Sequence, residues 1–147
     1  GTRMLGVTSD GLCFNSDTAA ANALDDYEEG TWTPTLTHGS ATASFARYTK
    51  IGRVVNFSVR LSTFTDTSTS TAIVVGGLPF TVLSTQAAGS VFGRYVNKAA
   101  GWSTLMTSGT TTDAYIYEWS DGNWNSLKHD LLDSSASQMY LEGTYIT

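Results

Sequence analysis

The sequence is poor in charge, histidine and proline, has a single cysteine, and contains no long apolar run. Charged side chains make up 14% of the 147 residues, against about 25% in an average soluble domain. Such a surface is either covered by Ser, Thr and Asn or partly buried between subunits. Cys13 stands alone, which excludes a disulfide within the chain, and we expect it to be a small apolar filler in an N-terminal strand. No stretch approaches the roughly 20 apolar residues that cross a bilayer, so membrane insertion is not expected.

The charge balance and the shortage of histidine bear on the class of function. The net charge of −5 argues against nucleic acid as a partner, because the eight Lys and Arg residues are scattered along the chain. The two histidines, His38 and His129, have no Gly-x-Ser-x-Gly motif beside them, and we expect both to be exposed polar residues. Cysteine, histidine and carboxylates do not occur at the spacing of a zinc site. The sequence therefore predicts no enzymatic activity, no cofactor and no metal.

Four carboxylates lie close together at positions 25, 26, 28 and 29. A cluster of this kind suits a hard cation such as Ca²⁺, but the Asp-x-Asp-x-Asp-Gly pattern of a calcium loop is missing. We expect a solvated acidic turn, or ion pairs with Arg47, Lys50 or Arg53.

Alternation of apolar and polar residues dominates the sequence after Gly30. The clearest strand is 53–63, where every second residue from Val55 to Leu61 is apolar, as is typical of an antiparallel sheet with one solvated face. About seven or eight such segments, separated by turn residues, predict an all-β fold, an antiparallel β-sandwich of jelly-roll type. Pro34 has no amide proton, so its strand is expected at an edge or a bulge, and Gly143 predicts a bulge in the closing strand 138–147.

The segment before Gly30 has a different pattern. Residues 1–16 predict a small hairpin or the last stretch of a stalk. In 17–27, several alanines follow two candidate caps, Asp17 and Thr18, so this segment predicts a short helix that Gly30 ends. We therefore expect residues 1–30 to form a stalk end with a short helical connector, and residues 31–147 to form the β-sandwich domain.

Aromatic side chains are the best sign of a binding site. Tyr115, Tyr117 and Trp119 alternate on one face of a predicted strand, and the turn that follows combines aromatic and polar residues. Sugar rings stack their C–H faces on aromatic planes, while Asp, Asn and Ser bond the hydroxyl groups. The candidate receptor contacts are Trp102, Asp121, Asn123 and Trp124. The alternative is that these aromatic residues fill the core or a seam between subunits.

Four motifs resemble the C-terminal head domains of bacteriophage tail fibres. They are Asn22–Pro34 (NALDDYEEGTWTP), Tyr48–Val55 (YTKIGRVV), Gly77–Phe80 (GLPF) and Gly143–Ile146 (GTYI). The resemblance spans most of the chain from residue 22 onward, although 81–135 carries no such motif. It implies a homotrimer of β-sandwiches around a threefold axis, with Leu24, Tyr27 and Trp32 as candidates for ordering the junction between stalk and head.

The same resemblance implies a function. It implies a non-enzymatic virion protein at the tip of a tail fibre, acting outside the cell, that binds a bacterial surface polysaccharide or an outer-membrane protein. Trimerisation strengthens weak sugar sites, because three sites on one rigid head bind a repetitive glycan together. Two alternatives stay open: a purely structural trimerisation or folding cap with receptor binding elsewhere on the fibre, and a small depolymerase or its sugar-binding accessory. Since Gly1 opens the chain, we expect it to be a piece of a longer protein.

Overall fold

The computed structural model describes residues 4–15, 17, 19, 23–24, 26–83, 87–97, 103–107, 109–120, 122–134 and 136–147. Within these residues the fold is all-β, as predicted. The strands are β1 (Leu5–Thr8), β2 (Gly11–Phe14), β3 (Tyr27–Thr31), β4 (Thr35–Leu36), β5 (Thr42–Ile51), β6 (Val54–Ser62), β7 (Val74–Gly76), β8 (Ala87–Arg94), β9 (Ser103–Thr107), β10 (Ala114–Ser120), β11 (Asn123–Ser126) and β12 (Gln138–Ile146). A short 3-10 helix spans His129–Leu131. In this part of the chain no helix has the length and apolar character needed to cross a membrane.

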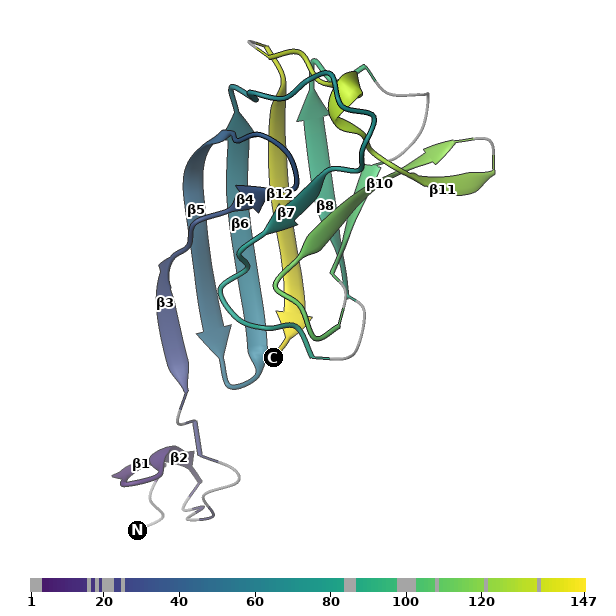
Figure 1. The fold of residues 1–147 in the computed structure, drawn as a ribbon. Coiled ribbons are helices and arrows are strands. Elements are labelled where there is room, and N and C mark those ends of the chain that lie inside the picture. Colours follow the sequence, from purple (N-terminus) through teal and green to yellow (C-terminus); the bar gives the residue numbers. More distant parts are fainter. Residues whose placement is uncertain are drawn as a thin grey trace.

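The described strands divide between a small hairpin and one large sheet. β1 and β2 pair with each other, and the other strands form an antiparallel sheet in the order β3-β5-β6-β12-β8-β9-β10-β7-β4, with β11 paired to β10 alone. In Figure 1, β4, β7 and β10 cross in front of β6, β12 and β8, so the sheet curls over on itself. The β1–β2 hairpin lies apart from this curled sheet, beyond the start of β3 (Figure 1).

The core lies inside the curl and is built by alternation along the strands. On β6, every second residue from Val55 to Leu61 is buried, while Asn56 and Ser58 face outward, which confirms the pattern predicted for 53–63. The other strands contribute further buried apolar residues: Val75, Leu105, Ala114, Ile116, Met139, Leu141 and Tyr145. Because β6 and β10 each have one buried and one more exposed face, their register decides which side chains remain available for binding.

The two ends of the large sheet are almost consecutive in sequence. Only residues 32–34 separate β3 from β4, yet β3 pairs with β5 at one end of the strand order and β4 pairs with β7 at the other. Trp32 lies at this crossing, where its indole N–H donates to the carbonyl of Ser58 over 3.4 Å and its ring packs edge-on against Phe57, with centroids 5.8 Å apart. β3 and β4 are both edge strands, but Pro34 lies between them and in neither, so the strand predicted to contain it at an edge or a bulge is interrupted there.

The bulge predicted at Gly143 in the closing strand is not there. Gly143 pairs in register with Phe57 on β6 and with Gly89 on β8. A Cβ at Gly143 would lie 2.9 Å from the Phe57 ring, and a Cβ at Gly89 would lie 2.3 Å from the carbonyl oxygen of Glu142. Both glycines therefore serve a close approach between strands, the other common reason for glycine inside a strand. A register shift occurs instead in β5.

The helix predicted over 17–27 is not found among the described residues of that segment, which are 17, 19, 23, 24, 26 and 27. Leu24 exchanges two backbone hydrogen bonds with Leu12 of β2, over 3.0 and 2.9 Å, and Tyr27 opens β3. The remaining positions lie outside the described residues. Alanine favours a helix locally, but so short a helix depends on packing partners. The hairpin predicted within 1–16 is confirmed by the pairing of β1 with β2.

Candidate functional site

The hairpin formed by β10 and β11 carries part of the predicted contact set. Figure 1 shows β11 projecting from the body of the sheet, and its only partner among the described strands is β10. Asn123 and Trp124 lie on β11 and are both exposed, whereas Trp102 and Asp121 lie outside the described residues. Gly122 has a φ of +77°, and Ser120 pairs with Asn123 across it, so the predicted tight turn is confirmed.

Trp119 and Trp124 form an exposed indole pair on this hairpin. The two residues are cross-strand partners, their ring centroids are 4.9 Å apart with planes at 72°, and they are 38% and 50% exposed. The side-chain amide of Asn125 donates to the Ser120 hydroxyl over 2.9 Å and fastens the two strands. Apolar ring surface flanked by amide and hydroxyl groups is the chemistry that binds a sugar ring.

The outward face of β10 extends this aromatic surface. Tyr115 and Tyr117 share the face of Trp119 and are partly exposed. The buried residues of the strand are Ala114, Ile116 and Glu118. The structure therefore contradicts the alternative that the aromatic residues of this strand fill the core, because the register gives the core the other set of side chains.

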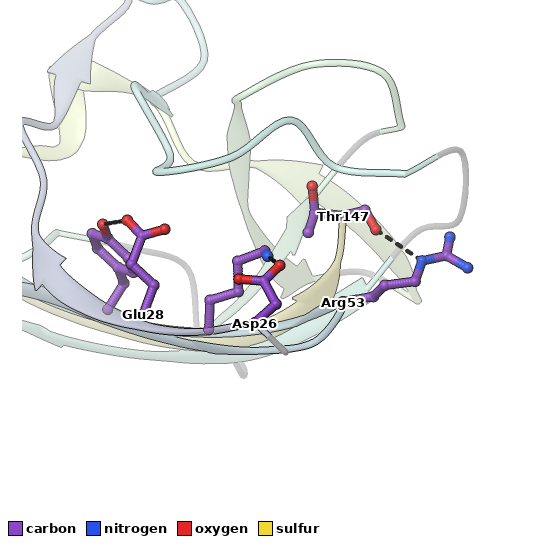
Figure 2. Close-up of polar contacts among 6 residues, drawn as sticks. Asp26, Glu28, Arg53 and Thr147 are labelled. Carbon is purple, nitrogen blue, oxygen red and sulfur yellow. Dashed lines mark hydrogen bonds and ion pairs between the residues drawn. The ribbon is translucent and has the colours of Figure 1, made fainter. Parts of the chain in front are cut away.

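The acidic segment before β3 is used for ion pairing and hydrogen bonding. Figure 2 shows Asp26 paired with Lys50, and Glu28 accepting a hydrogen bond from the Tyr48 hydroxyl, an interaction that raises the pKa of Tyr48. The predicted pairing with Lys50 is confirmed, while Asp25 lies outside the described residues. In the described part of the chain, no group of three or more His, Cys, Asp or Glu side chains is placed to hold a metal ion. The segment thus fastens β3 to β5.

His129 was expected to be exposed and is instead completely buried. Its Nδ1 lies 3.4 Å from the carbonyl oxygen of Asp66, and its ring meets the exposed His38 edge-on, with centroids 5.9 Å apart. The Asp66 carboxylate accepts hydrogen bonds from the Thr69 hydroxyl over 2.6 Å and from the Ser68 amide over 3.0 Å. These bonds, with the Thr69 hydroxyl contributing most, lower the pKa of Asp66 to about 2. The cluster anchors the Ser/Thr-rich loop after β6 against the 3-10 helix.

A groove of about 380 Å³ on the outer face of the sheet was not anticipated from the sequence. Arg60 on β6 lies opposite Tyr140 on β12, which lies opposite Phe92 on β8. The rings of Phe92 and Tyr140 are 6.0 Å apart, and the guanidinium carbon of Arg60 is 5.7 Å from the Tyr140 ring centre. Phe45 from β5 completes the lining. Phe45, Phe92 and Tyr140 are 67%, 64% and 42% exposed. We call this surface, defined by Phe45, Arg60, Phe92 and Tyr140, the aromatic–arginine groove.

The β1–β2 hairpin presents an apolar surface to solvent. Four apolar side chains on or next to its strands are more than half exposed: Met4, Leu5, Val7 and Phe14. Cys13 is buried, in agreement with its predicted role as an apolar filler. A lone two-stranded hairpin is marginally stable in water. These side chains therefore form a surface that contact with further protein would stabilise.

The three residues predicted to order a trimer junction lie in different surroundings. Leu24 is bridged to Leu12 and partly buried, Tyr27 on β3 is 60% exposed, and Trp32 is only 8% exposed within the core of its own chain. Their role at a junction stays a prediction. For Trp32, any effect on a junction would act through the fold of the protomer.

Comparisons with protein-family models, with curated proteins and with solved structures found no match for this chain.

Proposed function

We propose that the chain is the trimeric head of a bacteriophage tail fibre and binds saccharides on the surface of a bacterial host. The observation that carries the proposal is the indole pair of Trp119 and Trp124 on a hairpin that projects from the sheet. Tryptophan is favoured at binding hot spots because one rigid side chain supplies a large contact area at a small entropic cost. The tail-fibre motifs in the sequence supply the biological setting.

Self-association is supported by the apolar face of the β1–β2 hairpin. Fully burying one large apolar side chain is worth about 1.5–3 kcal/mol, so half-exposed positions repeated in three chains add up to a substantial driving force. Figure 1 places this hairpin far from β11, so a seam at the N-terminal end leaves the indole pairs free. In the proposed assembly, three curled sheets stand around a threefold axis as sandwiches of jelly-roll type.

Three copies of a weak site on one rigid head suit a polymeric ligand. A single aromatic sugar site gives low affinity, but a repetitive surface glycan allows all three to bind at once, and the second and third contacts then form at high effective concentration. The proposed receptor is therefore a repeating polysaccharide rather than a monosaccharide.

The test compares Trp124→Ala with Tyr95→Ala, which removes an exposed aromatic ring elsewhere; Trp124 is 50% and Tyr95 59% exposed. Loss of a central aromatic contact weakens binding by about tenfold or more. We expect Trp124→Ala to lower binding to host cells by at least that factor with no change in assembly mass, and Tyr95→Ala to bind normally. Binding should survive protease treatment of the cells and be lost after periodate oxidation of their glycans. Protease-sensitive binding would point to an outer-membrane protein instead.

A structural cap is the second candidate, favoured by the same exposed hairpin. It predicts stable trimers that neither bind host cells nor block phage adsorption. Unchanged cell binding by Trp124→Ala would contradict the role of the indole pair.

A further inference from the structure

We propose that the aromatic–arginine groove is a second saccharide site, and that it takes a sugar unit bearing a carboxylate, such as a uronic acid. The inference extends the proposed function, because it names a ligand class for a fibre head, but it rests on different residues. The groove lies on the outer faces of β5, β6, β12 and β8, whereas the indole pair lies on β10 and β11.

The backbone of Phe45 has an uncommon conformation beside the groove. This residue lies within the register shift of β5, between Ser44 and Arg47, and has a φ of +55°. A bulky side chain in the left-handed region costs free energy, and such strain is concentrated at functional sites. β-Bulges also re-aim side chains beside binding sites. Here the bulge holds an exposed phenylalanine ring over a groove, and Phe45 is not among the described residues that pack against the core.

The guanidinium of Arg60 gives the groove a charged hydrogen-bond donor. Its Nε is buried and has no hydrogen-bond partner among the described residues, while the group lies against the Tyr140 ring. Buried donors are nearly always partnered, and the Arg60 side chain lines the groove, so an acceptor bound in the groove can pair with its guanidinium. A planar carboxylate is the acceptor that matches the guanidinium fork, with two parallel charge-assisted hydrogen bonds.

The charged residues on the outer face around the groove are mostly cations. The outer faces of these four strands carry three cations, Arg47, Arg60 and Arg94, and one anion, Glu142, although the whole chain has a net charge of −5. This face therefore attracts an anionic ligand. The groove is also lined by Ser58, Ser90 and Glu142. These are acceptors and donors for sugar hydroxyl groups, while Phe92 and Tyr140 offer ring surface to the C–H face of the sugar.

The experiment titrates the full chain with a hexamer of uronic acid and, in parallel, with a neutral glucose hexamer, by calorimetry. We expect the uronate to bind and the neutral hexamer to bind at least about tenfold more weakly, as the loss of a charge-assisted pair requires. Arg60→Gln should weaken uronate binding at least about tenfold, and Arg60→Lys should give an intermediate loss because it keeps the charge without the fork. The matched control is Arg53→Gln, which changes net charge equally at a turn where Arg53 Nε donates to the Thr147 carbonyl over 3.1 Å (Figure 2).

Phe45→Gly separates a binding role from a structural one. Glycine relieves the left-handed strain, so the variant should unfold at the same or a higher temperature while binding uronate more weakly. A fall in unfolding temperature with unchanged binding would make Phe45 structural and overturn this part of the inference.

Uronate binding by Arg60→Gln equal to that of the wild type, or equal affinity for the neutral hexamer, would overturn the proposed ligand. A lower assembly mass in Arg60→Gln would also overturn it, by showing that the groove is a seam between copies of the chain. The proposed function has its own readout, since Trp124→Ala should bind the uronate hexamer normally at this groove and still lose host-cell binding.

Discussion

Replacing Trp32 by alanine tests whether this residue belongs to the protomer core or to a trimer seam. The side chain is 8% exposed, packs edge-on against Phe57, and donates a long hydrogen bond to Ser58. Truncating a buried tryptophan costs about 3–5 kcal/mol of unfolding free energy. At 3.4 Å the hydrogen bond adds little to that figure. The loss is concentrated where the chain crosses from one end of the sheet to the other.

For a chain of this size, 1 kcal/mol corresponds to about 3–4 °C in unfolding temperature, so Trp32→Ala should unfold roughly 10–20 °C below the wild type. Trp32→Phe, which keeps a ring against Phe57, should lose less than half of that. Tyr27→Ala removes a side chain that is 60% exposed and should change protomer stability by less than about 0.5 kcal/mol. Calorimetric and urea unfolding are compared at one fixed protein concentration, because dissociation of an oligomer is linked to unfolding.

A core position for Trp32 would be contradicted if Trp32→Ala unfolded at the wild-type temperature and had a reduced assembly mass. That combination would place Trp32 at a seam between chains and not in the core. If Tyr27→Ala destabilised the protomer as strongly as Trp32→Ala, the proposed difference between the two positions would also be wrong.

Three further predictions follow from the packing, the charges and the exposed hairpin. Gly89→Ala should lower the unfolding free energy by about 1–3 kcal/mol in urea unfolding, because the new methyl group meets a backbone oxygen at 2.3 Å. Gly93→Ala on the same strand should lower it by less than about 1 kcal/mol, because its methyl group meets only a side chain, at 3.2 Å. Asp66 has a pKa lowered to about 2, so its carboxylate stabilises the fold above the unfolded pKa of about 3.9 and the contribution is lost as pH falls towards 2; the stability difference between wild type and Asp66→Asn should shrink over that window. Val7→Ser combined with Phe14→Ser should weaken self-association in sedimentation experiments while leaving the large sheet folded, because both side chains face solvent in the single chain.

Each of these has a contrary outcome. Equal losses for the two glycine variants would mean that β8 and β12 do not approach as closely as described. A difference between wild type and Asp66→Asn that stays constant from pH 5 to pH 2 would contradict the lowered pKa. Unchanged association of the serine double variant would move the seam away from the hairpin.

Local patterns in the sequence predicted much of the sheet. Alternation over 53–63 predicted β6 with its correct buried face, and the turn predicted after Trp119 is found at Gly122. Where the sequence misled, a tertiary contact outweighed a local preference. The alanine-rich segment has helix propensity, but Leu24 pairs with β2. Gly143 has the signature of a bulge but serves a close approach to Phe57. Histidine is usually polar surface, but His129 is buried beneath a loop fixed by Asp66.

The sequence did not predict the aromatic–arginine groove, because long-range strand pairing brings its residues together. Alternation did not predict an outward position for Phe92, because the segment 89–96 is apolar on both faces except at Arg94. The alignment of Phe92 and Tyr140 with Arg60 could not be predicted either, because it requires β12, the last strand in the sequence, to insert between β6 and β8. The placement of Phe45 depends on a bulge at which the sequence has no glycine or proline. Long-range strand order and register are set by the whole core and not by any one segment.

We propose that this all-β unit assembles in threes through its N-terminal hairpin. Sedimentation equilibrium of the full chain at micromolar concentration tests it most directly. We expect a particle of three times the 15.7 kDa of one chain. Replacing Val7 and Phe14 by serine should lower the mass towards that of a single chain. A particle of 15.7 kDa for the unaltered protein would contradict it.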